Sequence, residues 1–262
     1  MHKDSVGKTI AVAIGLCLIC SILVSTAAVK LRPLQAENKR LDIKKNLLIA
    51  ADLLKGEKFT VDEIQKQYKK VQGSIVELST GEIKDTFDFE NFDARKAAKD
   101  SKLNYSISVK NDLAKIKFRS KYKKVYQIFE EGALTQIVLP VHGKGLWSTL
   151  YGFIALSPDG KTIRGIGFYE HAETPGLGGE IDNPKWKALW KGKIAYDSNL
   201  EPAIKIIKGN VNSSTPDRHH KVDGLSGATI TARGVQSLVN YWLGKDGFGP
   251  YLDKVRRGVT VL

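Results

Sequence analysis

The sequence predicts an α+β fold, a twisted antiparallel sheet with packed helices, preceded by one N-terminal transmembrane helix. Three features predict it: an uncharged apolar stretch near the N-terminus, a central series of strand-like segments, and an apolar helix face near the C-terminus. The chain has 262 residues, of which 42% are hydrophobic. This length is enough for one or two domains with a sizeable core.

Residues 9–29 contain no charged side chain, and a span of about 20 apolar residues crosses a hydrocarbon core of about 30 Å. The alternative is a cleaved signal peptide, because residues 25–27 are small, but a signal core usually has only about 7–15 residues. We therefore expect an uncleaved anchor. Basic residues are more numerous after the span than before it. Because long exported domains translocate largely regardless of charge, charge counting leaves the orientation open.

The composition limits the classes of partner. A formal net charge of +13 permits anionic partners, but the sequence has no zinc-finger, RNP or basic-zipper pattern, and we expect no nucleic acid. Both cysteines, Cys17 and Cys20, lie in the apolar stretch and are interpreted as small apolar residues of a membrane helix. The adjacent His219 and His220 lack a nearby carboxylate pattern, so we expect no metal site.

Between the span and the centre, residues 37–54 predict a helix that continues the membrane helix after a break at Pro33. Thr60 and Glu63 match a capping box that opens a second helix, ending near residue 71. Alternating polar and apolar residues then predict short strands at 74–78 and 105–109.

The centre of the chain is rich in strands. Four segments have strand composition, and a Ser-Pro-Asp-Gly turn at 157–160 separates the last two: 125–129, 135–141, 149–156 and 162–170. Asn183 and Pro184 form a helix start, and the helix that follows is expected to carry Trp186, Leu189 and Trp190 on one face. A further strand is expected at 203–207.

The segment 226–231 has the features of a phosphate-binding helix start. Residues 226–229 are small or hydroxylated, and an apolar helix face follows at Val235, Leu238, Val239 and Trp242, with i, i+3, i+4, i+7 spacing. Free N–H groups at a helix N-terminus bind phosphate. The alternative is an ordinary hydroxyl-rich helix start, which is common.

The complete string Ser-Gly-Ala-Thr-Ile-Thr at 226–231 resembles the flavinylation motif of the FMN-binding domain family. Residues 170–178 (Glu-His-Ala-Glu-Thr-Pro-Gly-Leu-Gly), 143–148 and 247–252 are similar to further signatures of that family. The resemblance implies that Thr231 carries FMN as a phosphoester. It also implies attachment by a flavin transferase outside the cytoplasmic membrane, which would place the C-terminal domain in the periplasm of a bacterial inner-membrane protein.

The family includes the C subunits of Na⁺-translocating NADH:quinone oxidoreductases and the G subunits of Rnf complexes. The long region 37–120 and the Gly-Phe-Gly-Pro ending favour the first. The resemblance thus implies an electron-carrying subunit of a membrane NADH:ubiquinone reductase that couples electron transfer to Na⁺ translocation, with the other subunits as partners. The implied organisation is a cytoplasmic N-terminus (1–8), a transmembrane helix (9–29), a connecting region (30–120) and an FMN-binding domain (121–262).

Besides Thr231, the resemblance and the local chemistry suggest a set of cofactor-binding residues. Backbone amides are expected to hold the phosphate, and side chains to line the isoalloxazine ring: Ser226, Gly227, Ala228 and Thr229 for the first, and Glu173, Thr174, Leu177, Leu146 and Trp147 for the second. A threonine hydroxyl is a poor nucleophile, so an external transferase is expected to activate it, and the chain need not contain its own base.

We expect no catalytic residue and no complete active site on this chain alone. It has no Gly-x-Gly-x-x-Gly fingerprint for NADH and only one apolar span. Three alternatives remain at this point: an Rnf-type electron carrier, a self-contained membrane-anchored flavin reductase, and a non-redox binding module.

Overall fold

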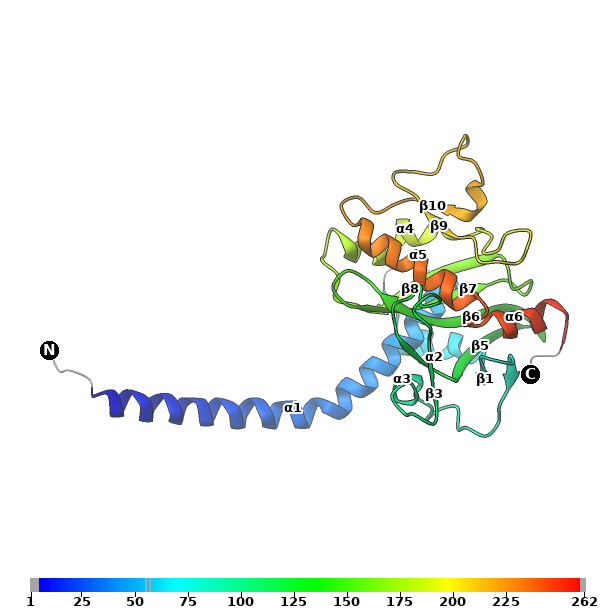
Figure 1. Ribbon diagram of the computed structural model, residues 1–262. Coiled ribbons are helices and arrows are strands. Elements are labelled where there is room, and N and C mark those ends of the chain that lie inside the picture. The colour runs from blue at the N-terminus through cyan, green and yellow to red at the C-terminus, as the bar shows by residue number, and fades with distance from the viewer. Residues whose placement is uncertain (1–4, 55, 57, 260–262) are drawn as a thin grey trace. The chain divides into compact units, whose positions relative to one another are not determined.

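The computed structural model describes residues 5–54, 56 and 58–259. They fall into two compact units that divide after residue 43. The first unit consists of the greater part of α1 (Val6–Ala50), and the second contains the last turns of α1, the sheets and the other helices, as Figure 1 shows.

Helix α1 is continuous, which corrects the expected break. It runs through Pro33, and the helix predicted at 37–54 is its C-terminal part. Proline removes one backbone N–H and crowds the preceding turn, but the rest of the hydrogen-bond ladder continues on both sides. An 18-residue window of α1 has a mean hydropathy of 2.5, none of it is buried in the protein, and the helix is long and apolar enough to cross a membrane.

The second unit is built on a six-stranded sheet with the order β2-β1-β5-β6-β7-β8, and every neighbouring pair is antiparallel. The four predicted central strands and the strand predicted at 74–78 are all present. The strands of this sheet are β1 (Val71–Glu77), β2 (Glu82–Ile83), β5 (Tyr122–Glu130), β6 (Ala133–Lys144), β7 (Thr149–Leu156) and β8 (Ile163–Glu170). Because β1 pairs along its whole length with β5, part of the region predicted as a connector belongs to this sheet.

Helices cover both faces of the sheet. Helix α5 (Thr229–Leu243), seen in Figure 1, packs across β6. Its apolar side chains join the main core together with those of α6 (Gly249–Arg256). On the other face, the amide of Gln136 donates to the carbonyl of Ala51, and a Cβ at Gly165 would lie only 2.3 Å from the Ala50 oxygen. The last turn of α1 is therefore in direct contact with the sheet.

The remaining elements are short. The predicted capping box is present, with Thr60 and Glu63 bonded reciprocally at the start of α2 (Val61–Tyr68). Around the main sheet lie α3 (Ala94–Ala97), the antiparallel pair β3 (Asn104–Ser106) and β4 (Phe118–Ser120), the 3₁₀ helices η1 (Gly178–Asp182) and η2 (Arg218–His220), α4 (Pro184–Ala188), and the parallel pair β9 (Lys205–Ile206) and β10 (Lys221–Val222). The strands expected at 105–109 and 203–207 are thus much shorter than predicted.

The helix that begins after Asn183 is also shorter than its pattern suggested. The Asn183 side chain accepts from Lys185 N at 2.9 Å, as the predicted cap requires, but α4 ends at Ala188. Trp186 and Trp190 are buried, whereas Leu189 is 37% exposed. The expected three-residue apolar face is therefore wrong for Leu189, whose side chain does not join the core that contains Trp186 and Trp190.

Candidate functional site

Thr231 lies in the first turn of α5 and is fully buried. Its hydroxyl donates to the Oε2 atom of Glu173 over 2.6 Å. Glu173 lies in the loop between β8 and η1, 58 residues earlier in the chain. Two residues from separate predicted motifs are therefore in direct contact.

The Glu173 carboxylate is surrounded by donors. The backbone N–H groups of Leu146, Trp147 and Ser148 donate to it over 3.2, 3.0 and 3.2 Å, and the Ser148 hydroxyl lies at 3.4 Å. Burial by itself would raise the pKa of Glu173. The hydrogen bonds from Thr231 and from the backbone of Trp147, Ser148 and Leu146 outweigh burial and hold this pKa below its usual 4.5. The buried carboxylate is therefore stable in its charged form.

Three glycines make this close packing possible. A Cβ at Gly178 would lie 2.6 Å from Thr231 Oγ1, and one at Gly145 would lie 2.6 Å from Glu173 Oε1. A Cβ at Gly234, on α5, would lie 2.5 Å from the Lys144 carbonyl oxygen. The absence of side chains at these positions lets the loop 145–148, the loop 173–178 and α5 meet at one point.

The N-terminus of α5 has no side-chain cap. Ala228 is the residue at the cap position, and Ser226, Gly227 and Thr229 around it are exposed. Gly227 has φ of +69°, a conformation that favours glycine. An uncapped helix start with small exposed neighbours fits a phosphate group, because the first N–H groups of a helix lack partners inside the helix.

Apolar side chains are exposed around the buried Glu173–Thr231 pair. Leu146, Trp147 and Leu177 are 42%, 67% and 45% exposed, and a Cβ at Gly227 would lie 3.0 Å from Leu177 Cδ2. The exposed Thr174 supplies the carbonyl that accepts from Leu177 and Gly179 and so shapes the 173–178 loop. These residues come from loops that meet at Thr231, and an exposed apolar surface there fits a flat aromatic ligand.

Sequence reasoning missed two further parts of the site. Ile230 is 58% exposed beside Thr231, and the signal was an isolated apolar residue in a segment of small and hydroxylated ones. His171 Nε2 lies 2.7 Å from Asp182 Oδ2, and its Nδ1 accepts the N–H of Glu173 over 3.2 Å. The hydrogen bond to Asp182 raises the pKa of His171, and the other ring nitrogen fixes the backbone of Glu173.

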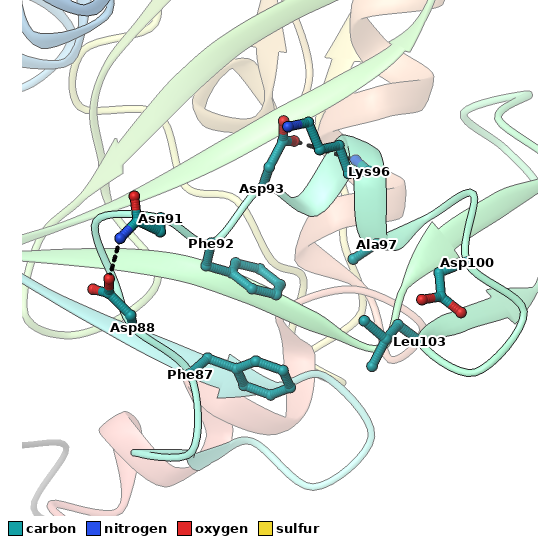
Figure 2. A pocket seen from close by; sticks show the side chains of 9 residues that line it. All are labelled: Phe87, Asp88, Asn91, Phe92, Asp93, Lys96, Ala97, Asp100 and Leu103. Carbon is teal, nitrogen blue, oxygen red and sulfur yellow. Dashed lines mark hydrogen bonds between the residues drawn. The ribbon is translucent and has the colours of Figure 1, made fainter.

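A cavity of about 350 Å³ on the same unit lies apart from the Thr231 site. That cavity is shown in Figure 2 and lies among α3, the turn before it and the segment after it, lined by Phe87, Asp88, Asn91, Phe92, Asp93, Lys96, Ala97, Asp100 and Leu103. Asp93 caps α3, and Asp88 accepts from Glu90 N and from the Asn91 amide. None of the predicted cofactor-binding residues lines this cavity.

Other candidate residues lie elsewhere. Cys17 and Cys20 are exposed on α1, and His220 Nδ1 donates to the Ile194 carbonyl over 2.7 Å. Within the described residues, no group of three or more His, Cys, Asp and Glu side chains is arranged to hold a metal ion.

The fold and the site define a class of protein. The family model of the FMN-binding domain matches residues 145–244, which include both loops and the helix start that meet at Thr231. The chain therefore contains an FMN-binding domain.

Comparison with individual proteins makes the assignment specific. The chain is 46% identical over 259 residues to the C subunit of the Na⁺-translocating NADH-quinone reductase of Pseudomonas aeruginosa, with 98% of each chain covered. It is 44% identical to the C subunit from Vibrio parahaemolyticus, again with 98% of each chain covered. A crystal structure of NqrC from Shewanella oneidensis matches with a TM-score of 0.77 and 36% identity, covering 84% of this chain and 99% of the other. The chain belongs to the family of Na⁺-translocating NADH-quinone reductase C subunits.

Proposed function

We propose that this chain is the electron-carrying C subunit of a membrane NADH:ubiquinone reductase that couples electron transfer to Na⁺ translocation. Membership of the C-subunit family and the FMN-binding domain support this role. FMN, when bound, supplies a ring that accepts and donates electrons, and the protein's part is to bind, orient and tune that ring. The sites for NADH and quinone and the ion path belong to other subunits, which are the partners of this chain.

FMN is attached covalently to Thr231 through its phosphate in this proposal. The observation that carries it is the position of the Thr231 hydroxyl at the uncapped start of α5, within the matched FMN-binding domain. The N–H groups of Ser226, Gly227 and Thr229 would hold the phosphate, whereas the N–H of Ala228 already donates to the Leu225 carbonyl over 3.2 Å. The side chains of Leu146, Trp147, Thr174, Leu177 and Ile230 would lie along the ring. After attachment Thr231 Oγ1 has no proton to donate, and a phosphate and a charged carboxylate repel each other, so Glu173 would move away from the phosphate or become protonated.

The chain is anchored by the apolar part of α1 as a single-pass protein of the bacterial inner membrane, with residues 1–8 in the cytoplasm and the FMN-binding domain in the periplasm. The length and hydropathy of α1 support the anchor. A flavin transferase that acts outside the cytoplasmic membrane would require this orientation.

The test is to coexpress the full-length chain with a flavin transferase and to measure the intact mass of the detergent-purified protein. The wild-type chain is expected to gain the mass of one FMN less one water and to fluoresce as a denatured band. Thr231→Ala should abolish both signals completely, since it removes the oxygen that forms the ester. The matched control is Thr229→Ala, which removes a hydroxyl two residues away and should retain the label. A labelled Thr231→Ala chain, or a wild-type Thr231 peptide recovered unmodified, contradicts the proposed attachment.

A further inference from the structure

We propose that Glu173 is the general base for the attachment of FMN, so that this chain contributes a catalytic carboxylate to its own modification. The inference rests on the proposed attachment at Thr231. It adds a catalytic role for a residue that sequence reasoning placed only along the flavin ring, and it changes the expectation that the transferase alone activates the threonine.

The Thr231 hydroxyl is already hydrogen-bonded to the carboxylate that would accept its proton. A hydroxyl has a single proton, and that of Thr231 is donated to Glu173 Oε2 over 2.6 Å. A candidate base must lie within about 2.6–3.2 Å of the proton-bearing atom, and Glu173 meets this requirement before any partner has bound. The lone pairs of Thr231 Oγ1 are left for the incoming phosphorus.

The buried Thr231 hydroxyl does not need a carboxylate to satisfy its hydrogen bond. A threonine in a helix commonly satisfies its hydroxyl with a backbone carbonyl of the preceding turn. Here an ionised group is instead buried to 5% exposure beside it, which is costly unless the group is well bonded. The backbone N–H groups of residues 146–148 hydrogen-bond to this carboxylate. The lack of side chains at Gly145 and Gly178 lets the carboxylate lie against Thr231.

The step balances without an oxidant or reductant. Thr231 Oγ1 forms a bond to the phosphorus of the FMN half of flavin adenine dinucleotide, and the phosphorus–oxygen bond of the pyrophosphate breaks. Adenosine monophosphate leaves, and the hydroxyl proton passes to Glu173. The transferase supplies the dinucleotide and stabilises charge on its phosphates. A carboxylate has the same part in protein kinases, where an aspartate accepts the proton of the substrate hydroxyl.

Phosphorus can reach the Thr231 hydroxyl only after a neighbouring segment moves. Thr231 is fully buried, and Gly178 lies so close that a Cβ there would be 2.6 Å from Oγ1. The segment 174–178 therefore has to move outward before phosphorus can reach the oxygen. Thr174, Pro175, Gly176 and Leu177 are exposed, whereas Gly178 at the end of the segment is buried against Thr231.

The experiment measures attachment itself and needs no assembled reductase. The apo full-length chain is purified in detergent from a host that lacks the transferase and is then mixed with purified flavin transferase, flavin adenine dinucleotide and Mg²⁺. The gain in intact mass is followed over time at several concentrations of the chain. We expect Glu173→Gln to lower kcat by about 10²–10⁴-fold, the usual contribution of a general base, with little change in KM for the chain. Glu180→Gln, the same charge change seven residues away, is the control and should react at the wild-type rate.

A second variant covers the case in which Glu173→Gln fails to fold. Glu173→Asp keeps the negative charge but shortens the side chain by about one carbon–carbon bond, roughly 1.5 Å, which draws the carboxylate back from Thr231 and from the N–H groups of residues 146–148. We expect a loss of at least about 10-fold in kcat from the misplaced base. Near-ultraviolet circular dichroism of each apo variant shows whether it is folded.

The outcomes separate this inference from the proposed function. A folded Glu173→Gln or Glu173→Asp chain that is labelled within about threefold of the wild-type kcat overturns the base, as does a rise in KM with kcat unchanged, which indicates only poorer docking. In both cases a wild-type chain labelled at Thr231 leaves the proposed function intact. A wild-type chain that gains no flavin at Thr231 under these conditions refutes the attachment first.

Discussion

Two buried polar clusters in the same domain differ in how they affect a buried charge. The Glu173 cluster consists of Glu173, Thr231 and the N–H groups of residues 146–148. The Lys123 cluster consists of Lys123, His142 and Trp242. Both Glu173 and Lys123 are 5% exposed. The Glu173 carboxylate accepts from charge-stabilising donors, whereas the Lys123 ammonium donates to the Pro140 carbonyl over 3.0 Å and lies 3.2 Å from His142 Nδ1.

The difference appears in the pKa values. The donors around Glu173 lower the pKa of its carboxyl and favour the charged form. Burial, followed by repulsion from Arg95 and Arg119, lowers the pKa of Lys123 well below 10.5 and favours the neutral form. Equal burial thus accompanies opposite effects on charge: the charged form is favoured at Glu173 and disfavoured at Lys123. The lesson is that backbone donors, and not burial alone, decide the state of a buried group.

The largest expected effect tests whether the Lys123 cluster is a packing element. Trp242 is fully buried, its ring lies 3.8 Å from Lys123 Nζ, and its indole donates to the His142 carbonyl over 2.6 Å. Trp242→Ala should lower the free energy of unfolding by about 3–5 kcal/mol. The control is Trp147→Ala beside the Glu173 cluster, whose side chain is 67% exposed, and it should change stability by no more than about 0.5 kcal/mol. Urea unfolding of the full chain in detergent, followed by near-ultraviolet circular dichroism, measures both. Equal losses of unfolding free energy for Trp242→Ala and Trp147→Ala would contradict the assignment of the Lys123 cluster as a packing element.

The next largest effect is expected when Glu173 and Lys123 are each replaced by an apolar residue. Glu173→Leu leaves three backbone N–H groups and the Thr231 hydroxyl without their acceptor, and we expect a loss of about 3 kcal/mol. Lys123→Met retains most of the volume of a side chain whose charged form is disfavoured by burial, and we expect a change of about 1 kcal/mol or less. The same unfolding assay near neutral pH measures the pair. A larger loss for Lys123→Met than for Glu173→Leu would mean that the ammonium, and not the carboxylate, is the well-bonded charge.

The sequence contained enough to predict the sheet and the helix that carries Thr231, because both depend on local periodicity and turns. The segments at 149–156 and 162–170 have strand composition with a strong turn between them, and they form β7 and β8. The contact between Glu173 and Thr231 was not predictable in this way. It depends on the close approach of three segments at Gly145, Gly178 and Gly234, which is a property of the tertiary packing. The continuity of α1 through Pro33 was also missed, because proline was given its usual weight as a helix breaker.

The smallest expected effect uses two histidines, one in each region, as opposite pH probes. Burial, followed by the charges of Lys123 and Arg95, holds the pKa of His142 well below 6.5. The unfolded chain therefore binds a proton that the folded chain rejects, so the stability contributed by His142 is present above 6.5 and is lost as the pH falls below that value. The His171 pKa is raised, so its contribution is present below 6.5 and is lost as the pH rises through the raised pKa.

His142→Phe removes this titration and keeps an aromatic ring against Tyr151 and Trp242. The advantage of the wild type over this variant should shrink by about 1 kcal/mol as the pH falls from about 7.5 to about 5.5, since one proton contributes at most about 1.4 kcal/mol per pH unit. The advantage of the wild type over His171→Asn should instead grow over the same interval. Unfolding curves at each pH give both differences. The stability difference between the wild type and His142→Phe could instead stay constant or grow on acidification. In that case the Lys123 cluster does not lower the His142 pKa, and the contrast fails for the Lys123 cluster while the Glu173 cluster is unaffected.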